Sequence, residues 1–420
     1  MFCLTETVAS PCMTLSRVNA ARGLTLAALL LAATGCGAKN TPADASRAGP
    51  DPLAKLQPAQ DMAAYRAMSD LLYKLDQDAI KRELAETRQE KSTKPTKDKL
   101  FGFDVKQALY DRDFIASAEG KALADSLLTY QTPSGGWSKR TDMSTPRQPG
   151  QQFGTEKDYV PTFDNYATTT QFWVMVNACN AHQDRRYCDS ASRALNLILL
   201  AQYPNGGWPQ SFPLRGKYHD DITFNDDAIA NLLKVVGAAA EGDERLAFLA
   251  ADLKAQAKHS LVRALDMLVA TQVEVNGEPT IWGAQHDDET LEPTSARAFE
   301  PVALATSESA DLVLFLMTLK NPPENVRKAI DSANRWFEQH QMHGLRYRRG
   351  DELPALIPDD DADPLWARFY DIESDRPVFG DRDGQVYFEL DKVSAERRAG
   401  YGWYTERPYK ALKEYRKWQQ

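Results

Sequence analysis

The chain has 420 residues, of which 43% are hydrophobic, 26% charged and 10% aromatic. This composition is typical of a folded globular protein and excludes a mainly disordered chain. The formal net charge of −9 argues against nucleic acid or anionic lipid as a partner of the whole surface. The length allows two or three domains, so the internal pattern of the sequence has to decide the organisation.

The first 36 residues (1–36) have the pattern of a bacterial signal peptide. Arg17 and Arg22 precede an apolar run over residues 23–33, which is too short to span a bilayer comfortably. Small residues then lead to Cys36, which resembles the lipidated cysteine of a lipoprotein, although Ala33 stands where leucine is usual. We predict an exported protein, either an outer-membrane lipoprotein that meets the membrane only through this anchor or a periplasmic or secreted protein.

Residues 37–100 precede the main domain, which we place at 101–420. Small and polar residues up to about residue 58 predict a flexible tether, and the apolar spacing from Met62 to about Arg88 predicts a helix. Further on, Cys179 and Cys188 flank a short polar turn. They either form a disulfide in an oxidising compartment or stay as buried thiols, and the sequence leaves both open.

A glycine-rich elbow recurs about every 70 residues. Its sequence is Gln-Thr-Pro-Ser-Gly-Gly-Trp at Gln131–Trp137 and Gln-Tyr-Pro-Asn-Gly-Gly-Trp at Gln202–Trp208, and degenerate copies begin at Gln272 and Gln341. An amphipathic run precedes each elbow, and a more apolar run follows it. Because β-type alternation is sparse, these outer and inner helices predict a mainly α fold, an α/α toroid of about three helical hairpins. The elbow itself has a structural explanation, since Gly-Gly permits positive φ there.

The last quarter of the chain has a different character. Residues 345–410 are rich in Arg, Tyr and Gly, and the run Gln385–Leu390 could belong to a small hairpin. Long loops in a helical domain are commonly functional. We predict a smaller, loop-rich lid with β structure that closes over one mouth of the toroid.

Two acidic groups stand at predicted helix starts, Asp164-Asn165 and Asn225-Asp226-Asp227. N-capping explains each of them separately. Because they occupy equivalent positions of the repeat, they also form a cluster of hard oxygen donors suited to Ca²⁺. The EF-hand pattern is absent, so such a site has to be assembled from distant segments.

Several other residues are candidates for chemistry. Arg297 lies just ahead of the third inner helix, at the mouth that the acidic groups share. Arg368 and Arg382 lie in the aromatic-rich C-terminal loops and could bind carboxylates bidentately, although salt bridges to neighbouring aspartates explain them equally well. His286 is a candidate base, but a single loop histidine is more often a hydrogen-bonding scaffold residue.

Together these motifs resemble the pectate lyases of polysaccharide lyase family 10. The resemblance covers roughly residues 101–415 and rests on the elbow together with Phe163–Thr168, Phe224–Asp227, Gln285–Asp287, Ala296–Glu300 and Arg368–Asp371. It implies an α/α toroid with a β-containing lid as the catalytic domain. It also implies residue roles: calcium ligation by Asp164 and by Asp226 or Asp227, substrate contacts from Asn165, Arg368 and Arg382, and catalysis by Arg297.

The implied reaction is β-elimination on polygalacturonate by a monomeric, calcium-dependent enzyme. The cation and the arginines would bind the uronate carboxylate and stabilise the charge that develops as the C5 proton leaves. Arg297 would take that proton. Arginine is essentially always protonated in proteins, so this role requires a site that makes the neutral form accessible.

Three other interpretations stay open. A glycoside hydrolase could use two of Asp226, Asp287 and Asp288 as its acid pair, and a surface lipoprotein could bind glycans without cleaving them. The repeat also matches that of triterpene cyclases, which are α/α toroids, but their Asp-x-Asp-Asp acid motif is absent because the acidic run at 359–363 lacks that spacing.

Overall fold

The computed structural model describes residues 53, 56–156 and 161–420. The predicted signal peptide, Cys36 and most of the predicted tether lie outside these residues. The predicted N-terminal helix is confirmed as α1 (Met62–Thr87), which Asp61 caps. Across the described part of the chain, no helix combines the length and apolar character that a membrane span requires.

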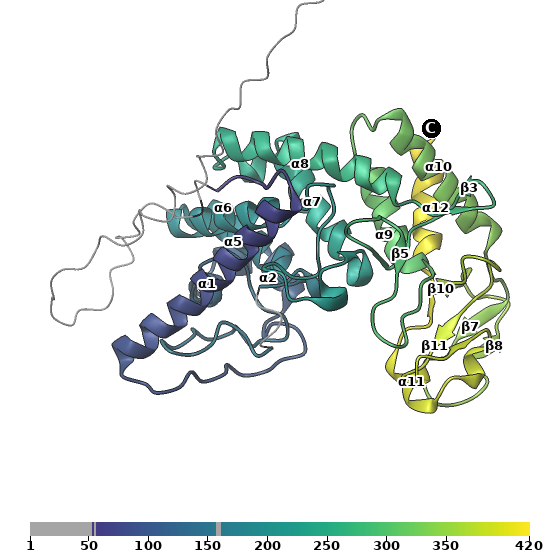
Figure 1. The fold of residues 1–420 in the computed structure, drawn as a ribbon, viewed down its shortest axis with the longest axis horizontal. Helices are drawn as coiled ribbons and strands as arrows, with labels where there is room; N and C mark the ends of the chain where they lie inside the picture. The colour runs from purple at the N-terminus through teal and green to yellow at the C-terminus, as the bar shows by residue number, and fades with distance from the viewer. Residues whose placement is uncertain (1–52, 54–55, 157–160) are drawn as a thin grey trace, which may run out of the picture. The chain divides into compact units, whose positions relative to one another are not determined.

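Alternating inner and outer helices form the framework of the described chain (Figure 1). The inner helices are α5 (Thr169–His182), α7 (Ala228–Glu241) and α9 (Thr306–Leu316), and the outer helices are α4 (Ala118–Tyr130), α6 (Arg185–Leu200), α8 (Ala251–Ala270) and α10 (Glu324–Gln339). The hairpins are α5 with α6, α7 with α8 and α9 with α10, and α7 contacts both other inner helices. The inner helices are buried along most of their length, as their apolar runs predicted. The mainly α toroid is confirmed.

The same two side chains tie each of the first three elbows to the helices on either side of it. The indole N–H of each elbow tryptophan donates to a carbonyl near the end of the preceding outer helix, at 2.7–2.8 Å, in the pairs Trp137–Leu127, Trp208–Ile198 and Trp282–Leu268. The Nε2 of each elbow glutamine donates to a carbonyl of the next outer helix at 3.0 Å, in the pairs Gln131–Ser190, Gln202–Ser260 and Gln272–Ala329. Buried polar groups need such partners, so these bonds fix the spacing of successive hairpins.

The backbone conformation explains why the first two elbows need glycine at their first Gly position. Gly135 has φ 110° and Gly206 has φ 100°, a region that side chains disfavour. A Cβ at Gly135 would lie 2.7 Å from the Arg193 carbonyl oxygen, and one at Gly206 would lie 2.2 Å from that of Arg263. The glycines therefore allow the elbow to touch the next outer helix. At the degenerate fourth elbow, Trp366 from the C-terminal segment donates instead to the Phe337 carbonyl at 3.0 Å.

The C-terminal segment adds short strands and two helices (Figure 1). Its strand pairs are β7 (Leu345–Tyr347) with β8 (Leu356–Pro358), β9 (Trp366–Ala367) with β13 (Tyr404–Thr405), β10 (Phe369–Tyr370) with β6 (Leu304–Ala305), and β11 (Phe379–Gly380) with β12 (Val386–Tyr387). The predicted hairpin near Gln385 is the last of these. Because β6 directly precedes α9, the β6–β10 pair joins the segment to the inner helices. The helices are α11 (Ala395–Gly400) and α12 (Arg407–Trp418), and α12 packs on α9 and α10.

Smaller elements complete the fold. They are α2 (Val105–Tyr110), α3 (Arg112–Ala116), the sheet of β1 (Ile222–Thr223), β4 (Gln285–His286) and β5 (Pro293–Thr294), the hairpin of β2 (Glu274–Val275) and β3 (Glu278–Pro279), and short 3₁₀ turns. Cys179 on α5 and Cys188 on α6 form a disulfide. The first of the two alternatives for these cysteines is therefore the one observed.

A carboxylate from α1 fastens the first elbow. Asp76 is only 4% exposed and accepts the backbone N–H and the hydroxyl of Ser134 at 2.8 and 2.6 Å. Burial raises the pKa of Asp76 to about 7, although the two hydrogen bonds act in the opposite direction. Because this pKa lies above the value of an unfolded aspartate, the folded state takes up a proton between about pH 4 and pH 7. The contribution of Asp76 to stability therefore falls as the pH rises through that range.

We predict that Asp76→Asn removes this part of the pH dependence. Asparagine can still accept the Ser134 N–H and can donate to the hydroxyl, so at about pH 8 the variant should exceed the native chain in free energy of unfolding by roughly 2–4 kcal/mol. Urea unfolding at about pH 4.5 and pH 8 measures the difference between the two proteins. The same difference at both pH values would contradict the prediction.

Candidate active site

Residues from three distant segments line one small cavity. Asp164, Asn165, Asp226 and Arg297 all contribute to a space of about 50 Å³, which suits an ion or a few water molecules rather than a sugar ring. The cavity lies at the starts of the inner helices α5 and α7. The common mouth expected from the repeat is therefore present, and it brings two acidic groups and an arginine together.

Two left-handed turns present the acidic groups. The 3₁₀ turns η3 (Asp164–Tyr166) and η5 (Asn225–Asp227) each hold two consecutive residues at positive φ, with Asn165 at 50° and Asp226 at 52°. Neither turn, nor the helix that follows it, has a side-chain capping bond at its start. Capping therefore does not explain these residues, and strained backbone of this kind is commonly found at functional sites.

The two carboxylates repel each other inside a buried site. Asp164 is 4% exposed, and its Oδ2 accepts from the Lys139 ammonium, while its Oδ1 is buried with no hydrogen-bond partner among the described residues. Asp226 Oδ2 accepts from Asn165 Nδ2 at 3.1 Å. Burial, followed by the charge of Asp164, raises the pKa of Asp226 to about 6, and nearby Arg368 opposes this shift. A cation between the carboxylates would relieve the repulsion.

The donor set fits a calcium ion but does not complete its shell. Two carboxylates and one carboxamide are the oxygen donors that Ca²⁺ prefers, and it takes six to eight of them. Within the described ranges, no group of three or more His, Cys, Asp or Glu side chains is placed to hold a metal ion. The remaining ligands would have to be water or substrate oxygens.

Arg368 reaches the site from the C-terminal segment. Its guanidinium pairs with Glu308 on α9, donates to Asn225 Oδ1 at 3.1 Å and lies 3.8 Å from Asp226 Oδ1. Burial alone would lower the pKa of Arg368, but the charges of Glu308, Tyr401 and Asp226 together with the hydrogen bond to Glu308 outweigh it, and the pKa lies above its usual value. Arg368 is therefore a fixed positive charge beside Asp226.

Arg297 is held by a neighbouring glutamate. Its Nε donates to Glu300 Oε2 at 2.7 Å, its Nη2 donates to Glu300 Oε1, and the hydroxyl of Tyr401 also donates to Oε1, at 2.8 Å. Burial would lower the pKa of the Arg297 guanidinium, but the hydrogen bond and charge of Glu300 raise it above its usual value. In this conformation the guanidinium is firmly cationic.

Arg382 lies beside Arg297 but outside the residues that line the cavity. Its guanidinium is 5.6 Å from the Phe299 ring, and that of Arg297 is 4.7 Å from the same ring. Arg382 is exposed and pairs with Glu396 at 2.8 and 3.0 Å. The salt bridge expected as an alternative for this arginine is therefore present, although with Glu396 rather than Asp381.

Asp227 points away from Asp164 although it adjoins Asp226. Its oxygens accept from Arg407 at 2.8 and 2.9 Å and from the Tyr166 hydroxyl at 3.0 Å. Asp227 is 4% exposed and does not line the 50 Å³ cavity. The geometry thus favours Asp226 over Asp227 as the calcium ligand, because both oxygens of Asp227 already have partners.

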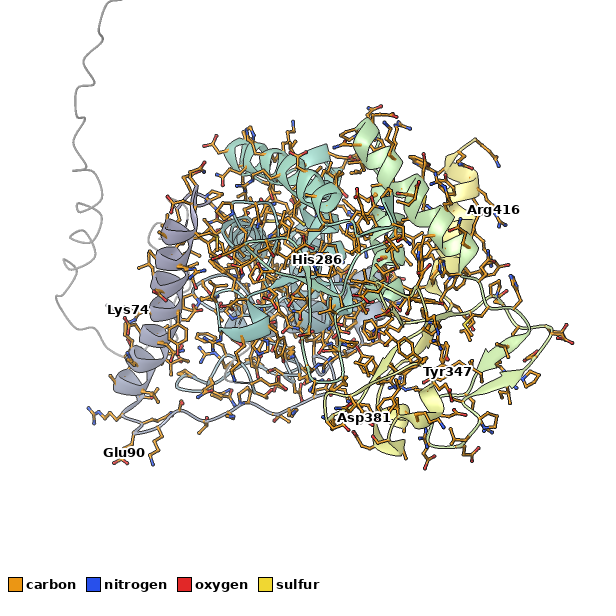
Figure 2. The ribbon with its side chains drawn as sticks, turned by 45° about the vertical axis from the view of Figure 1, so that its right-hand side comes forward. Lys74, Glu90, His286, Tyr347, Asp381 and Arg416 are labelled. Atoms are coloured by element: carbon orange, nitrogen blue, oxygen red, sulfur yellow. A yellow bond between two sulfur atoms is a disulfide. The ribbon has the colours of Figure 1, made fainter. Side chains whose placement is uncertain are left out.

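His286 lies in the interior of the protein (Figure 2). Its Nδ1 lies 2.8 Å from the Leu291 carbonyl, and its Nε2 accepts the Gly283 N–H at 3.1 Å. Burial lowers its pKa to about 4, so the ring is neutral at physiological pH. Both ring nitrogens have backbone partners, which supports the scaffold interpretation.

Four charged residues of the site were not predicted from the sequence: Lys139, Arg140, Glu300 and Glu308. Lys139 follows the first elbow tryptophan by two residues, and Gln210, which follows the second by two, lines the same cavity. Aligning the repeat copies beyond the tryptophan would have indicated this position. No such repeat position indicates Glu308, which lies in the first turn of α9.

Comparisons with known proteins agree with this geometry. A family model described as pectic acid lyase matches residues 131–412. The chain belongs to this family. Its structure is also similar to that of a family 10 polysaccharide lyase from Cellvibrio cellulosa, with 28% identity and a TM-score of 0.66 over 76% of this chain and 99% of that one.

A mutant of that Cellvibrio enzyme, described as in complex with trigalacturonic acid, gives 28% identity and a TM-score of 0.67 over 75% of this chain and 96% of that one. No curated protein matches the sequence. Together with the family match, these similarities identify the chain as a pectate lyase of polysaccharide lyase family 10.

Asp226 and Asp227 are adjacent in sequence, so the same substitution at each position tests which of them binds calcium. We predict that Asp226→Asn weakens calcium binding roughly 100-fold or more, because it removes one of two charged ligands. Asp227→Asn should change the calcium affinity by no more than about threefold, because the Asp227 carboxylate pairs with Arg407. Isothermal titration of both variants with CaCl₂ measures the difference. Equal losses would show that Asp227 also binds the ion.

Proposed function

We propose that this pectate lyase cleaves polygalacturonate by calcium-assisted β-elimination, with the calcium ion in the cavity between Asp164, Asp226 and Arg297 and the sugar bound against it. The observation that carries the proposal is the convergence of a carboxylate pair and a guanidinium, from three distant segments, in one cavity. The Cellvibrio relative described in complex with trigalacturonic acid supports a uronate ligand. The predicted export signal fits the proposal, because polygalacturonate is a large polymer that has to be cleaved outside the cell.

Calcium would be held by Asp164 Oδ1, Asp226 and the amide oxygen of Asn165. Asp164 Oδ1 is the strongest support, since it is buried and lacks a partner in the described part of the chain. A divalent cation supplies Lewis acidity, which draws electron density from a bound uronate carboxylate and makes the neighbouring C5 proton more acidic. The amide N–H of Asn165 orients Asp226 through the 3.1 Å bond.

Arg368 would bind the uronate carboxylate and oppose the negative charge that develops in the transition state. It is suited to this role because Glu308 and Asn225 hold its guanidinium before substrate arrives. Arg382, whose guanidinium lies near the same Phe299 ring as that of Arg297, would add a second, exposed contact. Exchanging its partner Glu396 for a substrate carboxylate requires little reorganisation at an exposed site.

Arg297 would remove the C5 proton while the C4 oxygen leaves. The Glu300 pair opposes this step, because it stabilises the protonated guanidinium. Burial acts in the required direction, and each positive charge that gathers in the cavity favours the neutral form. A proton-carrying Arg297 that only stabilises the carboxylate is the second candidate role, and the Glu300 pair favours it.

The acid pair of a glycoside hydrolase is not assembled around this cavity. Asp287 lies outside the cavity lining, and its Oδ1 accepts the backbone N–H groups of Glu289 and Thr290 at 3.0 and 2.7 Å. Asp288 also lies outside it. Elimination yields an unsaturated, ultraviolet-absorbing product, whereas hydrolysis yields a reducing end without that absorbance.

We predict that Arg297→Ala lowers kcat for polygalacturonate elimination by about 10³-fold and leaves polymer binding within about tenfold. Arg376→Ala, which removes an exposed arginine of the C-terminal segment, is the control. Absorbance of the unsaturated product gives kcat, and affinity electrophoresis gives binding. If Arg297 is the base, Arg297→Lys should retain activity with a pH–rate profile displaced to lower pH. An unchanged profile would favour a purely cationic role for Arg297.

Removal of calcium should stop turnover. We expect excess chelator to reduce the elimination rate to background, and added CaCl₂ to restore it, because the carboxylate pair alone repels an anionic substrate. The folded state should persist in chelator, and circular dichroism checks this. Full activity in excess chelator would overturn the calcium assignment without excluding elimination.

A further inference from the structure

A groove of about 730 Å³ runs beside the candidate active site. Its walls are α2 with the residues before it, the first turns of α5, and the middle of α7. We call it the α2–α7 groove. Its volume is within the range of ligand-binding pockets, whereas the catalytic cavity is too small for a sugar ring.

The groove adjoins the catalytic cavity through shared lining residues. Tyr166 lines the groove and also an adjoining cavity of about 230 Å³ that contains Arg368. That adjoining cavity shares Asn165 and Asp226 with the catalytic cavity. A chain molecule bound at Asp226 can therefore extend past Tyr166 into the groove.

The groove carries positive charge in a protein that is negative as a whole. Lys106 and Lys234 line it, both are exposed, and neither forms a salt bridge within the described residues. Lys234 donates to Asn231 Oδ1 at 3.2 Å, and the Nδ2 of Asn231 is buried with no partner in the described part of the chain. Asp104 is the one acidic residue in the lining, and its carboxylate accepts the Gln107 N–H at the start of α2.

Aromatic rings line the groove together with these lysines. Tyr110 is 79% exposed, Tyr166 is 40% exposed, and Trp173 is partly buried in the groove wall. Large rigid rings with a polar edge offer flat apolar faces without much loss of side-chain entropy. Such faces suit the C–H faces of pyranose rings, and their combination with ammonium groups in one groove suits a polymer of sugar carboxylates.

We propose that the α2–α7 groove binds further residues of the polygalacturonate chain, with Lys106 and Lys234 holding their carboxylates. This inference rests on the proposed function and extends it to the length of substrate that the enzyme grips. From Ala228, which follows the calcium turn, to Lys234 the helix α7 rises about 9 Å. A carboxylate bound at Lys234 therefore belongs to a different sugar from the one held at Asp226.

The outer wall of the groove comes from a segment before residue 131, where the family match begins. Asn177 on α5 fixes α2 in place by donating to the Leu109 carbonyl at 3.1 Å. Tyr110 and Lys106 are therefore positioned by the inner helix itself. The groove gives the enzyme a preference for long chains, which is the behaviour of an endo-acting lyase.

The test compares the double variant Lys106→Ala/Lys234→Ala with Lys254→Ala/Lys258→Ala, which removes two lysines from the outer helix α8. Elimination is measured on trigalacturonate and on long polygalacturonate. We expect the groove variant to raise KM for the polymer about fivefold with kcat unchanged, because two partly exposed ion pairs are lost. Its kinetics on the trimer and both activities of the control should stay within about twofold of the native enzyme. Lys106→Arg/Lys234→Arg should retain the native KM.

Equal losses on trimer and polymer, or an unchanged KM for the polymer, would overturn the groove proposal while leaving the proposed function intact. Polymer binding by both double variants in the Arg297→Ala background, measured by affinity electrophoresis, gives a readout independent of chemistry. If the native enzyme yields no unsaturated product, the proposed function fails. Weaker binding of the groove variant alone would then still support the groove, and equal binding would overturn it.

Discussion

Repulsion between two carboxylates, that of the buried Asp164 and that of the partly buried Asp226, is the constraint around which the site is built. Each carboxylate sits on a left-handed turn ahead of an inner helix, where non-glycine residues are strained. The surroundings compensate only in part: Lys139 covers one oxygen of Asp164, Arg368 lies near Asp226, and one buried oxygen of Asp164 has no partner in the described chain. The fold therefore stabilises an arrangement that a divalent cation would complete. The elbow bonds make this possible, because they hold the hairpins that carry the two turns at a fixed spacing.

The repeat distributes charge between the two turns. Asp164 corresponds to Asn225, and Asn165 corresponds to Asp226, so each turn carries one carboxylate and one carboxamide in opposite order. Four carboxylates at these positions would raise the electrostatic cost steeply. The amides are useful instead: Asn165 donates to Asp226, and Asn225 accepts from Arg368. The repeated hairpin thus provides two similar turns. Because one turn has an amide where the other has a carboxylate, the two turns can lie side by side with less charge repulsion.

The sequence could predict the toroid and the meeting of the turns because both follow from short-range features. Gly135 and Gly206 need positive φ, and the elbow glutamines and tryptophans bond to neighbouring helices, so each copy has the same local structure. Equivalent positions then face the same mouth. The orientation of Asp227 could not be predicted in this way, because Arg407, 180 residues away, determines it. The same holds for Trp366, which replaces the missing tryptophan of the fourth elbow from a different part of the chain.

The formal charges around the cavity suggest the order in which its ligands bind. The charged residues that line the cavity balance, with three carboxylates from Asp164, Asp226 and Glu300 and three cations from Lys139, Arg140 and Arg297. A bound divalent cation would make this set positive. An anionic uronate would then be attracted to it, so the proposed mechanism favours binding of the ion before the polymer. In the proposed mechanism, removal of the C5 proton would then take place in a site that has gained positive charge, which is the condition that lowers the pKa of a neighbouring guanidinium. The Glu300 pair would then keep Arg297 protonated and inert until the cavity is loaded, and it would be weakest at the moment a base is needed.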